Sequence, residues 1–159
     1  MKYCDNQHFH SLSQLLLKYD MRLILTADKD IPGSFWGDSE AGLIENRLYV
    51  RADTPVHSAL HEACHYICMD DQRRHALHTD AGGDYDEENG VCFLQILLSD
   101  FLQGIGKEEL FRDMDEWGYS FRLGNTRDWF YQDAEDTREW LLKHNIIDHN
   151  DMPTWQLRH

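Results

Sequence analysis

The chain has 159 residues, of which 29 are Asp or Glu and 15 are Lys or Arg, so its formal net charge is −14. This length suits one domain with a sizeable core, and an aromatic content of 12% argues against disorder. The negative charge opposes binding to nucleic-acid backbones and to anionic membrane surfaces, and no apolar run is long enough to cross a bilayer.

The first third of the chain is predicted to form one helix and a small sheet. Leucines at helical spacing predict a short amphipathic helix over residues 10–19. Short extended segments are expected at residues 21–26, 35–36, 41–44 and 48–51. Residues 30–33 (DIPG) and Glu45-Asn46 are turn signals between them. Their close spacing predicts a small, mostly antiparallel sheet.

The remainder of the chain is predicted to be mainly helical. Thr54 can cap a helix and Pro55 suits its first position, so a helix is expected from Pro55 to about Met69. Residues 70–85 are polar and contain glycines, as in a loop. Helical spacing of apolar residues follows from 86 to 102, and further helices are expected after it. With no repeat and no linker, residues 1–159 are predicted to form a single α+β domain.

The helix expected after Pro55 carries the sequence His61-Glu62-Ala63-Cys64-His65, an HExxH motif. Residues four apart lie on one face of a helix, so both imidazoles can bind one zinc ion. Glu62 can accept a proton from a water molecule at an open position on the metal. A chance match in a histidine-rich chain is the alternative, but the capped helix start favours the motif.

A catalytic zinc usually has three protein ligands, so the two histidines of the motif need a third ligand from elsewhere in the chain. The positions at which a metzincin carries its glycine and its third histidine are Cys68 and Asp71 here, which excludes that class. The remaining candidates are His75, His78, Asp84, Asp86, Glu87 and Glu88.

Glu87 is the favoured third ligand. It continues the apolar stripe of Val91, Leu94 and Leu98, and a carboxylate that points inward needs a partner such as a metal. Glu88, which lies above Cys92 and Gln95, is the second choice. An alternative role for Glu87 is to form a capping pair with Asp84 at the helix start.

The segment LYVR at 48–51, the motif HEACH and the helix opening EENGVCFLQILL together resemble the gluzincins, and especially the ImmA/IrrE-type metallopeptidases. The resemblance covers about residues 43–100. In that family the third-ligand helix is similar to Glu-x-x-Ala-Asn-x-Phe followed by Leu-Leu, and the matching positions here are Glu87, Gly90, Phe93, Leu97 and Leu98. The resemblance implies a small zincin-like domain, a zinc cofactor and Glu87 as the third ligand.

We therefore expect a zinc metallopeptidase that cleaves a peptide or protein substrate, with His61, His65 and Glu87 as zinc ligands and Glu62 as general base. The alternative is a non-catalytic binding or regulatory protein with a structural metal or none. Leu48–Arg51 is expected to be an edge strand to which an extended substrate adds. Candidate oxyanion donors are Tyr85, Tyr119, Tyr131 and the more distant histidines.

The expected location is cytoplasmic. The first ten residues contain no apolar segment typical of a secretory signal. Cys64 and Cys68 lie one helical turn apart, a poor spacing for a disulfide, so buried reduced thiols are predicted. Neither a nucleic acid nor a membrane is an expected partner, and the substrate and the oligomeric state do not follow from the sequence.

Overall fold

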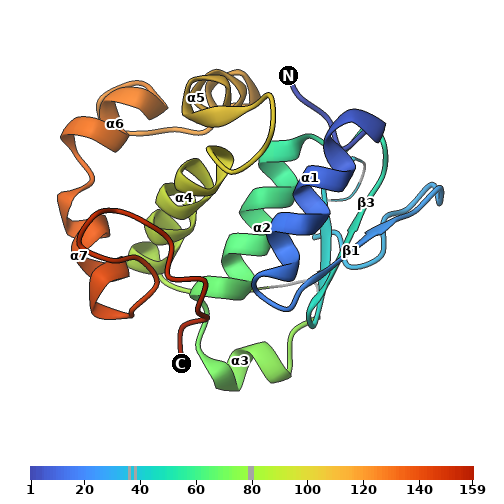
Figure 1. Cartoon of the computed structure of the whole chain (residues 1–159), viewed down its shortest axis with the longest axis horizontal. Coiled ribbons are helices and arrows are strands. Elements are labelled where there is room, and N and C mark those ends of the chain that lie inside the picture. The colour runs from blue at the N-terminus through green and yellow to red at the C-terminus, as the bar shows by residue number, and fades with distance from the viewer. Residues whose placement is uncertain (36, 38, 79–80) are drawn as a thin grey trace.

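The computed structural model describes residues 1–35, 37, 39–78 and 81–159, and its architecture is α+β, as predicted. The elements, in chain order, are α1 (Asn6–Leu17), β1 (Arg22–Leu25), β2 (Gly42–Ile44), β3 (Arg47–Val50), α2 (Val56–Cys68), α3 (Asp71–His75), α4 (Tyr85–Ser99), α5 (Gly106–Trp117), α6 (Thr126–Gln132) and α7 (Glu135–Lys143). The strands lie on one side of α2, and α4 lies on its other side, with α7 beyond it (Figure 1).

The three strands form a mixed sheet in the order β1-β3-β2. β2 and β3 are the antiparallel arms of a hairpin, whereas β1 runs parallel to β3. The prediction of a mostly antiparallel sheet is therefore wrong. Parallel neighbours need a long connection, and residues 26–41 supply it before the hairpin begins. Phe35, expected to be extended, is not in a strand, and Trp36 lies outside the described residues.

β3 is the central strand of the sheet, so the expectation that Leu48–Arg51 forms a free edge is wrong. The two edges of the sheet belong to β1 and β2, and loops of the protein already cover the edge of β2. The Leu43 N–H donates to the Gly33 carbonyl (3.3 Å), and the Glu45 N–H donates to the Leu77 carbonyl (3.1 Å). These loops occupy the edge where a substrate strand would add.

The start of α2 is closed by the N-terminal segment rather than by a side chain. The helix begins at Val56, with Pro55 at the N-cap position. The Val56 N–H donates to the Lys2 carbonyl (2.9 Å), while the Thr54 hydroxyl accepts from the Arg51 N–H (2.9 Å). Thr54 therefore stabilises the preceding turn and does not cap the helix as predicted. Much of α2 is fully buried, including Ala59, Leu60, Ala63, Cys64 and Ile67.

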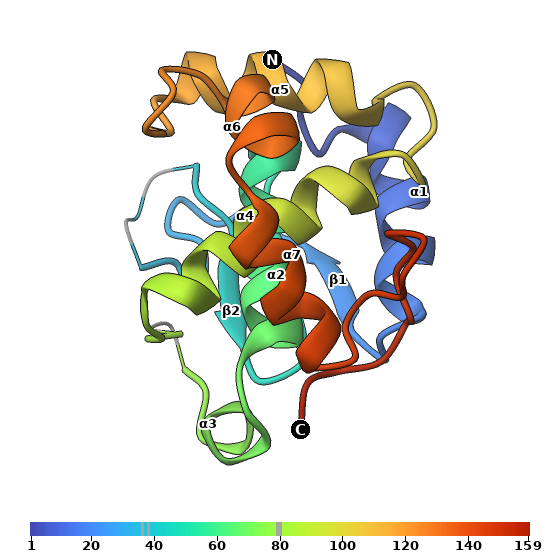
Figure 2. The ribbon, with the colours of Figure 1, turned by 90° about the vertical axis from the view of Figure 1, so that its left-hand side faces the viewer.

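α4 is enclosed by three other helices, α2, α5 and α7. Figure 2 shows α7 on the near side of α4 and α2 on its far side. The Asp84 side chain accepts from the Glu87 N–H (2.9 Å) and caps the helix. Gly90 faces α7, where an added Cβ would lie 2.8 Å from the Trp140 ring. The absence of a side chain at this position is what lets the two helices approach closely.

The polar segment predicted as a loop contains the short helix α3, which Asp70 caps by accepting from the Arg73 N–H (2.9 Å). This helix is too short to show a repeat of apolar residues. All four cysteines are buried as free thiols. Among the residues that the structure describes, no helix combines the length and the apolar character needed to cross a bilayer.

We predict that Gly90→Ala destabilises the fold, although alanine is the better helix former by about 1 kcal/mol. The new methyl group meets the rigid Trp140 ring, and overpacking of this kind costs about 1–3 kcal/mol. Urea unfolding followed by circular dichroism measures the change. In a Trp140→Ala background the same substitution should no longer destabilise. A more stable single variant would show that the α4–α7 contact is not tight.

Candidate metal centre

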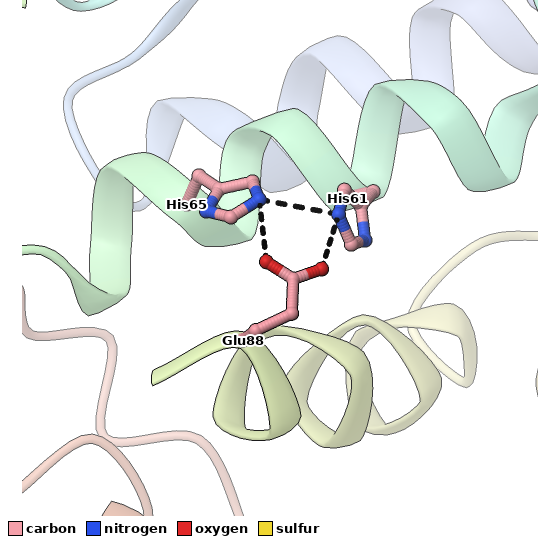
Figure 3. Close-up of side chains that lie close together, drawn as sticks. All are labelled: His61, His65 and Glu88. Atoms are coloured by element: carbon pink, nitrogen blue, oxygen red, sulfur yellow. Dashed lines mark hydrogen bonds and ion pairs between the residues drawn. The ribbon is translucent and has the colours of Figure 1, made fainter. Parts of the chain in front are cut away.

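Three side chains from two helices converge at one point. His61 and His65 project from successive turns of α2, and Glu88 projects toward them from the first turn of α4 (Figure 3). The Nε2 atoms of the two histidines lie 3.2 Å apart. One carboxylate oxygen of Glu88 lies 3.0 Å from His61 Nε2, and the other lies 3.1 Å from His65 Nε2.

The donor set and its spacing fit a zinc ion. Zinc in proteins binds imidazole nitrogen and carboxylate oxygen at about 2.0–2.2 Å, which in a tetrahedral site puts the ligand atoms roughly 3.3 Å apart. The three observed separations, 3.0, 3.1 and 3.2 Å, are close to that value. Within the described part of the chain, no fourth His, Cys, Asp or Glu joins the group.

Glu87, the expected third ligand, does not approach the histidines. It is buried, with 2% of its surface exposed, as its position in the apolar stripe of the helix predicts. Its partners are the guanidinium groups of Arg73, from α3, and of Arg158 (2.9 Å), from the C-terminal segment. The inward carboxylate is therefore satisfied by arginines, and the second choice, Glu88, is the acid that faces α2.

The other third-ligand candidates lie apart from this group. Asp84 is the N-cap of α4, and Asp86 is exposed in its first turn. His75 is exposed at the end of α3. The backbone of His78 forms an isolated bridge with Ile44 beside β2.

Gln95 orients His61, a role that the HExxH motif alone does not predict. Its Oε1 atom accepts from His61 Nδ1 (2.7 Å), and its Nε2 atom donates to the His57 carbonyl (3.3 Å). Because the amide oxygen only accepts, it fixes a proton on Nδ1 and leaves Nε2, which faces Glu88, as the nitrogen available to a metal. Gln95 lies two turns after Glu88 on the same face of α4, so a polar residue in an otherwise apolar helix was the available signal.

The histidine–glutamate group opens into a cavity of about 400 Å³. Glu62, the predicted general base, lines this cavity next to His61 and His65, as do Trp117 and Tyr119 from the end of α5 and the turn after it. The structure thus brings the two histidines and the glutamate of the HExxH motif together with Glu88 in one solvent-accessible hollow.

The electrostatics of the cavity distinguish two carboxylates, Glu62 from the motif and Glu88 from α4. Burial raises the pKa of Glu62, and the nearby Glu40 and Glu88 add to the rise, although the two histidines oppose it. Burial alone would also raise the pKa of Glu88, but its contacts with His61 and His65 hold that pKa well below its usual range. Glu88 is thus held as an anion, whereas the pKa of Glu62 is shifted in the opposite direction.

Tyr119 is the oxyanion candidate that lies in the cavity. Its hydroxyl lies 3.2 Å from His57 Nδ1, and its ring packs edge-on against the His61 ring. Burial raises the pKa of Tyr119 to about 12, so the hydroxyl keeps its proton. Tyr85 and Tyr131 are both exposed and lie elsewhere on the surface.

His57 is neutral in the folded protein. Burial, followed by the neighbouring His61, lowers the pKa of His57 to about 3. In the described structure its Nε2 atom has no hydrogen-bond partner. Because an unpartnered acceptor is tolerated better than an unpartnered N–H, the proton belongs on Nδ1, which donates to the Tyr119 hydroxyl. The Tyr119 proton is then free to point into the cavity.

We predict that His57 makes the fold acid-sensitive. Below about pH 6.5 the unfolded chain protonates this histidine and the folded chain does not, so stability falls as the pH decreases toward about 3. Relative to His57→Phe, wild type should lose up to about 1.4 kcal/mol per pH unit in that window. Urea unfolding at pH 7, 5 and 4 measures this, and the exposed His149→Phe is the matched control. Equal pH slopes for wild type and His57→Phe would contradict the assignment.

Comparisons of the chain with protein-family models, with curated proteins and with solved structures give no match. The resemblance to ImmA/IrrE-type metallopeptidases therefore stays a prediction from the sequence.

Proposed function

We propose that the chain is a zinc-dependent hydrolase that cleaves amide bonds in a peptide or protein. One observation carries the proposal: two motif histidines and Glu88 converge within ligand spacing, and Glu62 lies beside them in the same cavity. His61, His65 and Glu88 would hold the metal. When bound, zinc supplies Lewis acidity, which polarises a carbonyl group and lowers the pKa of water.

Glu62 acts as the general base in this proposal. Its carboxylate takes a proton from the attacking water molecule and passes it to the nitrogen of the leaving amine. Burial raises its pKa, which brings the carboxylate closer to the range in which it both accepts and releases a proton near neutral pH. Tyr119 stabilises the oxyanion in this proposal, because its hydroxyl can donate to the substrate oxygen on which negative charge develops.

The same geometry supports a zincin-like fold as part of the proposal. The strands β2 and β3 pack on one side of the motif helix, and the helix that carries the third ligand packs on the other. A cytoplasmic location is also proposed, because all four cysteines are buried, free thiols, as is usual in a reducing compartment.

A non-catalytic protein with a structural zinc is the competing function. Structural zinc sites are closed by four protein ligands, whereas catalytic sites keep one position open. The group here offers three ligands among the described residues, and the Glu88 side chain is 48% exposed toward solvent. Both features favour the enzyme.

We predict that the protein binds about one zinc per chain and that Glu88→Ala weakens this binding at least about 100-fold. Loss of an outer-shell partner alone typically costs 10–100-fold in affinity, so loss of a direct ligand should cost more. Competition with a chromophoric chelator measures the affinity.

Glu87→Ala is the matched control for that experiment. It should keep the zinc but lower the free energy of unfolding by about 2 kcal/mol or more, because two arginines lose their carboxylate partner. Loss of zinc from Glu87→Ala alone would show that the ligand assignment is reversed.

We also predict that Glu62→Gln keeps the fold and the zinc but lowers turnover by about 10²–10⁴-fold, the usual contribution of a general base. The amide matches the carboxylate in shape but cannot accept the proton. Cleavage of a peptide library, read by mass spectrometry with and without zinc, provides the assay. If wild type and Glu62→Gln cleave alike, Glu62 is not the base, and a structural zinc becomes the better account.

A further inference from the structure

The cavity contains a third carboxylate, Glu40, that neither zinc binding nor proton transfer uses. It comes from the segment just before β2. Its Oε2 atom accepts from the Ser58 hydroxyl (2.8 Å), and the Ser58 oxygen in turn accepts from the Ala41 N–H (3.0 Å). Ser58 is only 2% exposed, so the Glu40 carboxylate is held by a buried, fully engaged hydroxyl on α2.

This tether places Glu40 close to the reacting groups. Ser58 lies on α2 one helical turn before Glu62, so the two side chains share a face of the helix. The proximity is also electrostatic, because Glu40 contributes to the raised pKa of Glu62 and of Tyr119. A substrate group bound at Glu40 would therefore lie near the scissile bond.

Within the described lining of the cavity, no basic side chain balances the charge of Glu40. Among the described residues that line the cavity there are three carboxylates, Glu40, Glu62 and Glu88, and no lysine or arginine. A bound zinc ion would carry two positive charges, which the carboxylates of Glu88 and of ionised Glu62 would match. Glu40 has no such counterpart, and a carboxylate in a partly desolvated hollow gains from a cationic partner.

The aromatic lining of the cavity suits a cation as well. Trp117, which is 44% exposed, lines this cavity and also the adjoining hollow that includes Ser39, the residue before Glu40. An aromatic face beside a carboxylate is a favourable environment for an ammonium or guanidinium group, which can stack on the ring while its N–H groups reach the oxygens.

We propose that Glu40 is a specificity-determining residue that binds a cationic nitrogen of the substrate. The substrate class is then a polypeptide with a positive group close to the scissile bond, either a free α-ammonium group or a lysine or arginine side chain. The inference rests on the proposed function, because it names the substrate of that site. The net charge of −14 would also steer basic chains toward the protein.

Binding of short peptides tests this without relying on turnover. Each probe is titrated by calorimetry into the Glu62→Gln protein, with and without zinc, so that no probe is consumed. One arm compares acetyl-Ala-Arg-Ala-amide with its citrulline counterpart, which has the same shape and no charge. The other arm compares Ala-Ala-Ala-amide with its acetylated form.

At least one arm should show about 10-fold or tighter binding of the charged probe, as expected for a charge-assisted hydrogen bond. Adding Glu40→Gln should abolish that preference while leaving zinc content unchanged. The exposed Glu139→Gln, with the same change of charge on α7, should preserve it. Glu40→Asp, which withdraws the carboxylate by one methylene, should weaken the preference and serves if Glu40→Gln folds poorly.

The arm that responds identifies the source of the cation. Equal binding of charged and neutral probes in both arms would overturn the inference, and so would a preference that survives Glu40→Gln. The two proposals fail separately: a Glu40-dependent preference without any cleavage by wild type supports the cation site and removes the hydrolase. Cleavage of neutral, acetylated peptides as fast as charged ones would support the hydrolase and remove the cation site.

Discussion

The packing of α4 against α2 is the contact on which the site depends. The two histidines are brought together by one turn of a single helix, but their carboxylate partner comes from the second helix and requires that helix to lie at the right height and rotation. Each face of α4 has a distinct neighbour. Glu88 and Gln95 face α2, Gly90 faces α7, and Glu87 faces the arginines.

The buried carboxylate of Glu87 helps to fix that rotation. Arg73 and Arg158 both bind it, so a short helix and a distant segment are joined to the first turn of α4. The Arg158 side chain also donates to the Cys68 carbonyl at the end of α2 (3.1 Å). The end of α2 and the start of α4 are thus held together next to the histidine–glutamate group. Two adjacent acids therefore have different tasks: one holds the helices, and its neighbour faces the histidines.

The comparison of Glu87 with Glu88 shows what the sequence can and cannot predict. The i, i+4 spacing of the histidines is a local property, so the helix and its paired imidazoles could be predicted. Burial of Glu87 also followed from its stripe. The partners of Glu87 could not be predicted in this way, because Arg73 and Arg158 are distant in the sequence and α4 is covered on several faces. An inward direction does not specify which neighbour a side chain meets.

The same limit explains the sheet. The hairpin of β2 and β3 joins residues close in sequence and was foreseen, whereas the parallel pairing of β1 with β3 depends on where a long connection returns. α3 escaped prediction because it is a single short turn stabilised by its cap. Glu40, Ser58 and Trp117 lie far apart in the chain and share a cavity only after folding, so no sequence pattern linked them.

Gln95 has a consequence for how this protein would respond to selection. It is a fully buried amide in an otherwise apolar stretch of helix, and it serves the orientation of one imidazole. Loss of one partner of a buried hydrogen bond leaves the other unsatisfied, at a cost of about 1–3 kcal/mol. Leucine at this position would leave the His61 Nδ1–H without its acceptor. Selection for heat resistance alone would therefore tend to keep the amide, and with it the orientation of His61.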